Sequence, residues 1–277
     1  MIWKIKNRRL DLSRQAQVMG ILNVTPDSFS DGGKFDGLEN ALAHAREMIT
    51  QGAAIIDIGG ESTRPGAGPV AADMEIARTI PVIRALRAEW DGYISIDTTK
   101  SAVATAALTA GADIVNDVSG LTADPEMKAV CAASDCGIIV MHMQGNPENM
   151  QDNPSYENVT SEVHAFFLER LATLTALGIS LERICFDPGI GFGKSLEHNL
   201  ELLRNIERLA PPDTPLLLGI SRKSFLAKTT SASIPADRDA PTAALTALTR
   251  SKGIMLHRVH AVKENLAALR IAEALEK

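Results

Sequence analysis

Eight short apolar runs recur along the 277-residue chain, and nearly every one of them ends in a polar residue. Continuous apolar runs of this length are typical of parallel strands that are buried on both faces. The runs cover residues 17–23, 54–57, 93–97, 113–116, 137–142, 183–187, 216–222 and 254–258.

Stretches rich in Ala, Leu, Glu and Arg separate these runs. They are roughly 10 to 25 residues long, which is enough for the helical crossover that two parallel strands require. Apolar residues recur at helical spacing in residues 38–51, 73–90, 100–110, 156–177, 196–209, 243–251 and 263–275. Eight such strand and helix units predict an α/β fold, a (β/α)8 TIM barrel of about 250 residues, so we expect residues 1–277 to form a single domain.

Two segments fall outside this repeat. Residues 1–16 form a short N-terminal leading segment, which we expect to be a hairpin that closes the bottom of the barrel. Residues 229–239 carry Ser, Pro and alternating charge without periodicity, which predicts a surface connection between a short helix and the next full helix.

The overall charge argues against several classes of partner. The formal net charge is -6 and no stripe of Lys or Arg is present, so nothing in the sequence favours binding to nucleic acid or to an anionic membrane. No apolar run approaches the roughly 18 residues of a membrane span, and no signal-peptide pattern is present. The three cysteines lack the spacing of metal ligands, which favours reduced thiols and a cytoplasmic location.

Polar residues at the strand ends are the candidate site. In a barrel of this kind the carboxyl ends of all strands meet at one mouth, and Asp97, Asn116 and Asp187 each follow a strand directly. Carboxylates and an amide can bind the N–H edge of a flat heterocycle such as a pterin or a purine. Each residue alone could instead cap the next helix, and it is the set of three that favours a ligand site. The residues expected at the mouth are Asn23, Asp57, Asp97, Asn116, His142, Asp187, Lys223 and Arg258.

Cationic residues follow the last two strands. Lys223 lies in the segment 221–224 together with hydroxyl groups, at the place where barrels often bind phosphate or set a cation against a ring. Arg258 and His260 would point the same way in an extended segment, and they predict an anion clamp next to a helix N-terminus. The alternatives are a salt bridge at the barrel rim for Arg258 and a contact at the helix start for His260.

Three loops have a composition that suits a substrate site. Residues 25–34 and 59–69 are dense in turn formers, as expected for loops that cover a substrate. The glycine-rich segment 187–194 lacks the spacing of a dinucleotide-binding or phosphate-binding loop. We expect its glycines to make room for a flat ligand beside Phe192, and we expect His142 to be a pocket wall rather than a metal ligand.

Seven separated motifs occur in order, at residues 20–33, 57–66, 95–98, 141–145, 187–194, 221–224 and 258–260. They include Asp57-Ile-Gly-Gly-Glu-Ser-Thr-Arg-Pro-Gly66 and Arg258-Val-His260. Together they are specific, and the chain resembles the dihydropteroate synthases of the bacterial folate pathway over essentially its whole length. The resemblance implies a transferase that joins 6-hydroxymethyl-7,8-dihydropterin diphosphate to p-aminobenzoate and releases diphosphate and 7,8-dihydropteroate.

The resemblance also implies a role for particular residues. The implied pterin-binding residues are Asp97, Asn116, Met141, Asp187, Phe192, Gly219 and Lys223. The implied diphosphate-binding residues are Asn23, Thr63, Arg64, Arg258 and His260, and Asn23 would help to hold a Mg2+ ion. The implied p-aminobenzoate pocket consists of Phe29, Thr63, Pro65, Phe192, Lys223 and Ser224. The implied catalytic residues are Asp97, Asp187, Lys223, Arg258 and His260. Arg258 and His260 would neutralise the diphosphate together with Mg2+, and Asp97 and Asp187 would support positive charge on the ring.

Two residues depart from the family pattern. Ala261 stands where the family commonly has Asp, which puts the positioning of nearby groups in doubt, and His257 before Arg258 is less usual. The second loop keeps the ordinary pattern Thr63-Arg64-Pro65, so we expect inhibition by sulfonamides that compete with p-aminobenzoate.

Two other functions remain as alternatives. A pterin-dependent methyltransferase would share the barrel and the acids but would have no diphosphate to hold, and a catalytically silent pterin-binding paralogue would lose loop or anion residues first. The presence of Asn23, Arg258 and His260 argues against both. Similar enzymes dimerise through helices late in the barrel, and the Ala-rich faces after Ala243 would allow a homodimer.

Overall fold

The computed structural model describes residues 1–25, 34–63 and 66–276. Its main sheet consists of β3 (Gln17–Asn23), β4 (Ile55–Gly59), β5 (Tyr93–Asp97), β6 (Ile114–Asp117), β7 (Gly137–Met141), β8 (Ile184–Asp187), β9 (Leu217–Gly219) and β10 (Leu256–Val259). The strands are parallel and lie in the order β8-β7-β6-β5-β4-β3-β10-β9. A parallel bridge between Phe186 and Leu216 joins the two ends of this sheet, so the predicted eight-stranded barrel is confirmed.

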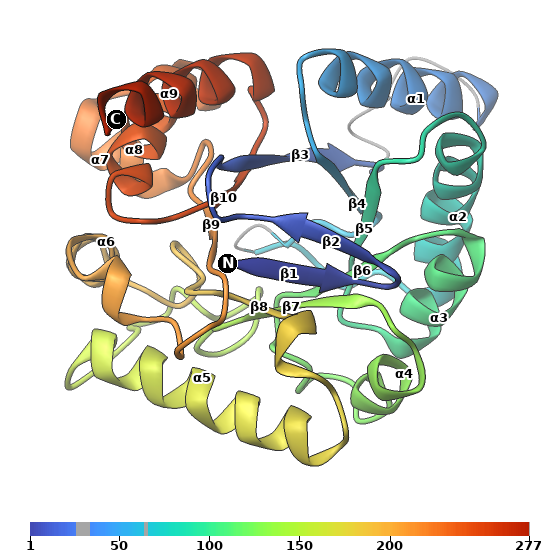
Figure 1. Ribbon diagram of the computed structural model, residues 1–277, viewed down its shortest axis with the longest axis horizontal. Coiled ribbons are helices and arrows are strands. Elements are labelled where there is room, and N and C mark those ends of the chain that lie inside the picture. Colours follow the sequence, from blue (N-terminus) through green and yellow to red (C-terminus); the bar gives the residue numbers. More distant parts are fainter. Residues whose placement is uncertain (26–33, 64–65, 277) are drawn as a thin grey trace.

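Helices surround the barrel as a ring, which is seen end-on in Figure 1. They are α1 (Lys34–Thr50), α2 (Ala72–Glu89), α3 (Ser101–Ala110), α4 (Met127–Ala133), α5 (Val159–Ala176), α6 (Leu196–Arg204), α7 (Ser224–Thr230), α8 (Asp239–Arg250) and α9 (Val262–Leu275). Three short 3-10 helices lie in the connections: η2 (Leu181–Arg183) before β8, η3 (Ile206–Arg208) before β9 and η4 (Pro235–Arg238) before α8. No helix in the ranges that the structure describes is long and apolar enough to cross a membrane.

The predicted boundaries differ from the structure in a few places. The stretch 196–209 is divided into α6 and η3 at Asn205, whose backbone leaves the helical region. The surface connection 229–239 contains η4, and α8 begins four residues earlier than predicted, at Asp239. Helix α4 was not predicted, because its seven residues are too few to show a helical period.

The leading segment is a hairpin of β1 (Ile2–Ile5) and β2 (Arg8–Asp11), as predicted. The hairpin lies across the centre of the ring of helices (Figure 1). Trp3 and Ile5 are fully buried against the lower ends of the strands, and Trp3 Nε1 donates to the carbonyl oxygen of Arg183 at 2.9 Å. The hairpin therefore fills the lower end of the barrel with apolar side chains.

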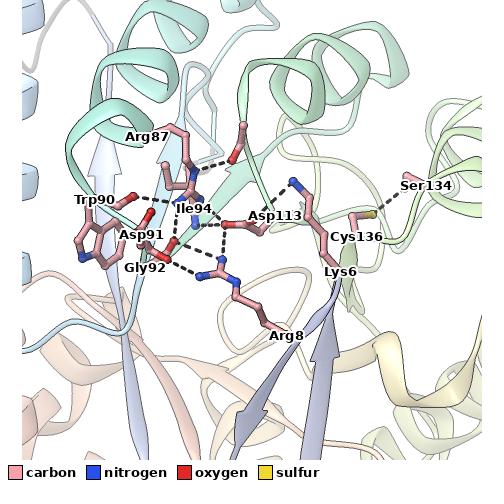
Figure 2. Close-up of polar contacts among 11 residues, drawn as sticks. Lys6, Arg8, Arg87, Trp90, Asp91, Gly92, Ile94, Asp113, Ser134 and Cys136 are labelled. Atoms are coloured by element: carbon pink, nitrogen blue, oxygen red, sulfur yellow. Dashed lines mark hydrogen bonds and ion pairs between the residues drawn. The ribbon is translucent and has the colours of Figure 1, made fainter.

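Charged contacts fasten the hairpin to the barrel, as Figure 2 shows. The carboxylate of Asp113, which precedes β6, accepts from Arg87, from Arg8 at 3.1 Å and from Lys6 at 3.4 Å. Arg87 also donates to the carbonyl oxygen of Trp90 at 2.8 Å, at the carboxyl end of α2. Cations at that position complement the helix dipole, so the cluster joins the hairpin, α2 and β6.

The barrel interior changes from apolar to polar along the strands. Side chains in a strand alternate between faces, so residues two positions apart both point into the barrel. The lower layer is apolar and packs on the hairpin, with Met19, Ile55, Ile114, Ile139, Cys185, Leu217 and Leu256. Two positions further on, the same strands carry Ile21, Asp57, Asn116, Met141, Asp187, Gly219 and Arg258. The polar groups are therefore concentrated on the mouth side of an apolar layer.

Candidate active site

A buried network of charges lies at the centre of the mouth. Arg258 Nε donates to Asp57 Oδ2 at 2.6 Å, and another guanidinium nitrogen of Arg258 donates to Asp97 Oδ2 at 2.7 Å. Asn116 Nδ2 also donates to Asp57 Oδ2, at 3.1 Å. Asp57 is fully buried, and Asp97 and Asn116 are nearly so. Arginine and carboxylate geometry of this kind fixes the side chains relative to one another.

The second oxygen of each carboxylate is available to a ligand. Asp57 Oδ1 and Asp97 Oδ1 are buried and have no hydrogen-bond partner within the described ranges. Buried polar atoms are normally hydrogen-bonded, so unpaired acceptors beside the mouth indicate that a donor from outside the chain completes them. A ring with several N–H groups would supply such donors.

Burial shifts the proton affinities of this network. Burial raises the pKa of Asp97 to about 7, although Arg258 lowers it, and Asp57 adds to the rise. Burial lowers the pKa of Arg258, but the carboxylates of Asp57 and Asp97 raise it more, so the guanidinium stays charged. One cation therefore lies between two carboxylates whose negative charges repel each other.

Asp187, Gly219 and Lys223 form the opposite side of the mouth. Asp187 Oδ1 accepts from the backbone N–H of Gly189 at 2.7 Å. A Cβ atom at Gly219 would stand 3.4 Å from Asp187 Oδ2, 3.9 Å from Lys223 Nζ and 4.0 Å from the Cβ of Arg258. A methyl group at Gly219 would thus lie in van der Waals contact with Asp187, Lys223 and Arg258, so Gly219 lies among these three residues.

Lys223 contacts the glycine-rich segment. Its Nζ donates to the carbonyl oxygen of Ile190 and lies 4.4 Å from the centroid of the Phe192 ring. Burial lowers the pKa of Lys223 to about 8, Asp187 opposes this shift and Arg258 adds to it. Burial also raises the pKa of Asp187. The cation–π contact and the nearby Asp187 carboxylate both favour the charged form of this lysine.

The glycines of the glycine-rich segment have a different role from the one expected. A Cβ atom at Gly189 would lie 1.9 Å from the carbonyl oxygen of His142, and one at Gly193 would lie 2.3 Å from that of Gln144. Both glycines have positive φ values, +62° and +59°. They make room for the backbone that follows β7, and the expectation that they make room for a flat ligand was wrong.

The predicted anion clamp is divided between two sets of contacts. Arg258 turns into the barrel toward Asp57 and Asp97, whereas His260 Nδ1 lies 2.9 Å from Ser221 Oγ. Ser221 Oγ also accepts from the His260 backbone N–H at 3.1 Å. His260 is therefore held at the mouth by the loop after β9, while Arg258 is held by carboxylates.

The two departures from the family pattern, His257 and Ala261, lie in β10 and at the start of α9. Ala261 is the N-cap of α9, so this helix begins without a side-chain cap. His257 is fully buried, and its Nε2 lies 3.0 Å from Thr249 Oγ1 on α8. His257 thus joins β10 to the helix layer outside the barrel.

Asn23 and Asp97 face one another across Gly59. Asn23 Oδ1 and Asp97 Oδ2 each lie 3.8 Å from the point where a Cβ atom at Gly59 would stand. No group of three His, Cys, Asp or Glu side chains is placed to hold a metal ion in the part of the chain that is described. Any ion here would therefore depend on few protein oxygen atoms and on oxygens of a ligand.

The remaining predicted residues are only partly located. Met141 is buried and pairs in register with Asp187, Ser224 is exposed at the start of α7, and Thr63 is the last described residue before a gap. Phe29, Arg64 and Pro65 lie outside the described residues.

Sequence reasoning missed the roles of several residues. Asp57 was placed at the mouth without a role, yet it joins Arg258 to Asn116. Lys100 was also overlooked, and its Nζ contacts Glu61 at 2.6 Å and the buried Glu75 at 2.9 Å. These contacts tie the second loop to α2 and α3. Asp57 was visible as a carboxylate in an apolar strand, but the Lys100 contacts had no local sequence signal.

The chain is similar to known proteins over almost all of its length. A family model described as "Pterin binding enzyme" matches residues 19–260. A dihydropteroate synthase of Synechocystis is 46% identical over 265 residues, which are 96% of this chain and 92% of that protein.

Solved structures agree with this. A Yersinia pestis dihydropteroate synthase in complex with a sulfonamide drug aligns with a TM-score of 0.93 at 42% identity, covering 100% of this chain and 99% of that chain. A Xanthomonas albilineans dihydropteroate synthase with 4-aminobenzoic acid aligns with a TM-score of 0.92 at 40% identity, with the same coverage of each chain.

Proposed function

Because the chain belongs to the pterin-binding enzyme family and is a transferase of the dihydropteroate synthase type, we propose that the groups at its barrel mouth divide the reaction among them. The reaction condenses 6-hydroxymethyl-7,8-dihydropterin diphosphate with p-aminobenzoate and gives 7,8-dihydropteroate and diphosphate. The observation that carries the proposal is the buried Asp97 Oδ1, which has no hydrogen-bond partner among the described residues, in a barrel of this family.

The pterin binds in the polar layer of the barrel. Its N–H groups donate to the carboxylates of Asp97 and Asp187, and Asn116 completes the edge. The ring lies beside Gly219, with Met141, Phe192 and Lys223 around it. The free oxygen of Asp97 and the short approach of Asp187 to Gly219 support this placement.

The diphosphate binds at the upper edge of the mouth. Arg258 and His260 supply positive charge or hydrogen bonds there, and Asn23, Thr63 and Arg64 complete the anion site. An Mg2+ ion fits this edge because Mg2+ takes oxygen ligands and commonly uses one or two protein groups together with substrate phosphates. Asn23 Oδ1 would hold it. Bound there, Mg2+ would neutralise charge on the leaving diphosphate.

The chemical step is the loss of diphosphate from the pterin methylene. The C–O bond breaks with its electron pair going to the diphosphate, and the resulting cation is delocalised into the ring. Asp97 and Asp187 stabilise this positive charge from buried positions, where electrostatic interactions are strong. The amine of p-aminobenzoate then forms the new C–N bond and loses a proton. The chain needs no covalent intermediate for this sequence.

The p-aminobenzoate ring binds nearer to the surface. Phe192, Lys223 and Ser224 provide one side of its pocket, and Phe29, Thr63 and Pro65 from the two loops provide the other. We assign Lys223 to both substrate sites. Its ammonium lies over the Phe192 ring, and its Cδ lies 3.1 Å from the point where a Cβ atom at Gly191 would stand. Covering loops would exclude water from the cation.

Residues 1–277 form the unit that carries this activity, as a single cytoplasmic domain. The buried, unpaired thiols of Cys131, Cys136 and Cys185 support a reducing compartment. A pterin-dependent methyltransferase or a silent paralogue is less well supported, because the similar proteins named above are dihydropteroate synthases over the full length of this chain.

Purified protein mixed with dihydropterin diphosphate, p-aminobenzoate and Mg2+ should release diphosphate and form dihydropteroate in equal amounts. A chelator should slow this release, because uncompensated charge on the leaving diphosphate raises the free energy of activation for breaking the C–O bond. A sulfonamide should compete with p-aminobenzoate. Tight pterin binding without either product would contradict the synthase and favour one of the alternatives.

The value of kcat/KM for the dihydropterin diphosphate should fall as the pH rises through about 8. The physical reason is the pKa of Lys223, which burial lowers from 10.5 to about 8, so the cation is present below this pH and lost above it. Steady-state rates between pH 6 and pH 9.5 measure the profile. Lys223→Arg should remove the fall, because arginine stays protonated. A wild-type profile that stays flat to pH 9.5 would disprove the assignment.

We also propose a homodimer formed through α8 and α9. Large apolar side chains are exposed on these neighbouring helices, namely Leu248 at 65%, Ile271 at 64% and Leu275 at 83%. Sedimentation equilibrium should give twice the 29.6 kDa mass of one chain. The double variant Leu248→Glu/Ile271→Glu should give the mass of one chain, because charge replaces the exposed apolar surface. The single mass for the unaltered protein at all concentrations would exclude the dimer.

A further inference from the structure

Lys194 is a buried lysine with unusual partners. Its side chain is only 3% exposed, and its Nζ lies 3.0 Å from His142 Nδ1, 2.9 Å from the carbonyl oxygen of Phe192 and 3.3 Å from that of His142. Burial and the nearby charge of Lys223 lower the pKa of Lys194, and the carboxylate of Asp187 opposes this shift. Burying an amine costs free energy unless hydrogen bonds satisfy it.

The contacts remain satisfied whichever form the amine takes. A charged ammonium donates three hydrogen bonds, to the two carbonyl oxygens and to an unprotonated His142 Nδ1. A neutral amine donates two and accepts one from a protonated Nδ1. Burial lowers the pKa of both Lys194 and His142, and that of His142 falls to about 3, so the imidazole is neutral. The arrangement thus does not depend on pH near neutrality.

Lys194 and Lys223 hold the glycine-rich segment from two sides. Lys194 binds the carbonyl oxygen of Phe192, and Lys223 binds that of Ile190 and stands over the Phe192 ring. Tyr156 adds a contact from its hydroxyl to the Gly193 carbonyl oxygen at 2.8 Å. Gln151 Nε2 donates to the Gly191 carbonyl oxygen at 2.7 Å. Among the described residues, the Lys194 side chain joins the Phe192 carbonyl oxygen to His142, which directly follows β7.

We propose that Lys194 is a positioning residue for substrate binding, which places the Phe192 ring and, through the same segment, the ammonium of Lys223. The proposal rests on the roles given above to Phe192 and Lys223. Lys194 is the last residue of the segment, its Nζ donates back to the carbonyl oxygen of Phe192, and it need not touch either substrate. Its loss would allow the segment to move by fractions of an ångström, which is enough to weaken binding where groups must be held closely.

Lys194→Met tests this, because methionine fills similar volume without a hydrogen-bond donor. We expect KM for both substrates to rise about tenfold, as for the loss of hydrogen bonds that leaves buried acceptors unsatisfied, while kcat changes by less than about threefold because the Arg258 network is untouched. Lys252→Met is the matched control, since Lys252 also donates to a backbone carbonyl, of Arg204 at 2.8 Å, but lies outside the mouth. It should leave both constants unchanged.

Coupling between the two lysines separates positioning from general loss of structure. If Lys194 acts through the segment that also holds Lys223, the loss in kcat/KM in Lys194→Met with Lys223→Met should be smaller than the product of the two single losses. A loss in the double variant equal to the product of the two single losses would overturn the proposal. So would a KM in Lys194→Met that matches the wild type.

Substitutions of His142 keep the test valid if Lys194→Met does not fold. His142→Leu removes one of the three contacts and should raise KM about threefold, and His142→Asn, whose amide can replace Nδ1, should restore the wild-type value. Equal KM values in both variants would also overturn the proposal. Failure of the wild-type enzyme to form dihydropteroate would instead disprove the proposed function, so the two failures are distinguishable.

Discussion

The contact of Arg258 with Asp57 and Asp97 is the interaction on which the mouth depends. It places a cation between two buried carboxylates at 2.6 Å and 2.7 Å, and Asn116 joins the same group through Asp57. Without the guanidinium, two like charges would be buried side by side, which is strongly unfavourable. With it, each acid keeps one oxygen that has no hydrogen-bond partner among the residues that the structure describes. The network is thus stable in the free protein and incomplete in a way that a pterin can satisfy.

The fold supports such a network by separating the apolar and polar parts of the barrel. The hairpin that carries Trp3 closes one end and packs on an apolar layer, so water is kept from the polar layer on that side. Rigid strands carry Asp57, Asp97 and Arg258, whereas the segment with Phe192 is held by contacts from Lys194 and Lys223. The two substrates would therefore be held by different means, the pterin by the strands and p-aminobenzoate more by loops.

Much of this could be predicted from the sequence, because strands and their ends are local features. The eight apolar runs marked the strands, and β3 and β5 begin and end where the pattern placed them. The partners of Arg258 could not be predicted, since Asp57 lies 201 residues away and only closure of the barrel brings them together. Gly189 and Gly193 were misread for the same reason. Glycine in a loop signals a close approach, but the sequence does not say whether a ligand or the backbone at His142 approaches.

Binding of the dihydropterin diphosphate to Asp57→Asn, measured by titration calorimetry alongside urea unfolding, is the most direct test of the buried network. Asparagine keeps the shape of Asp57 but removes the charge that holds Arg258. The account predicts a lower free energy of unfolding, by about 3 kcal/mol as for breaking a buried ion pair, and at least about tenfold weaker binding by the folded protein. Stability and affinity both equal to the wild type would contradict it.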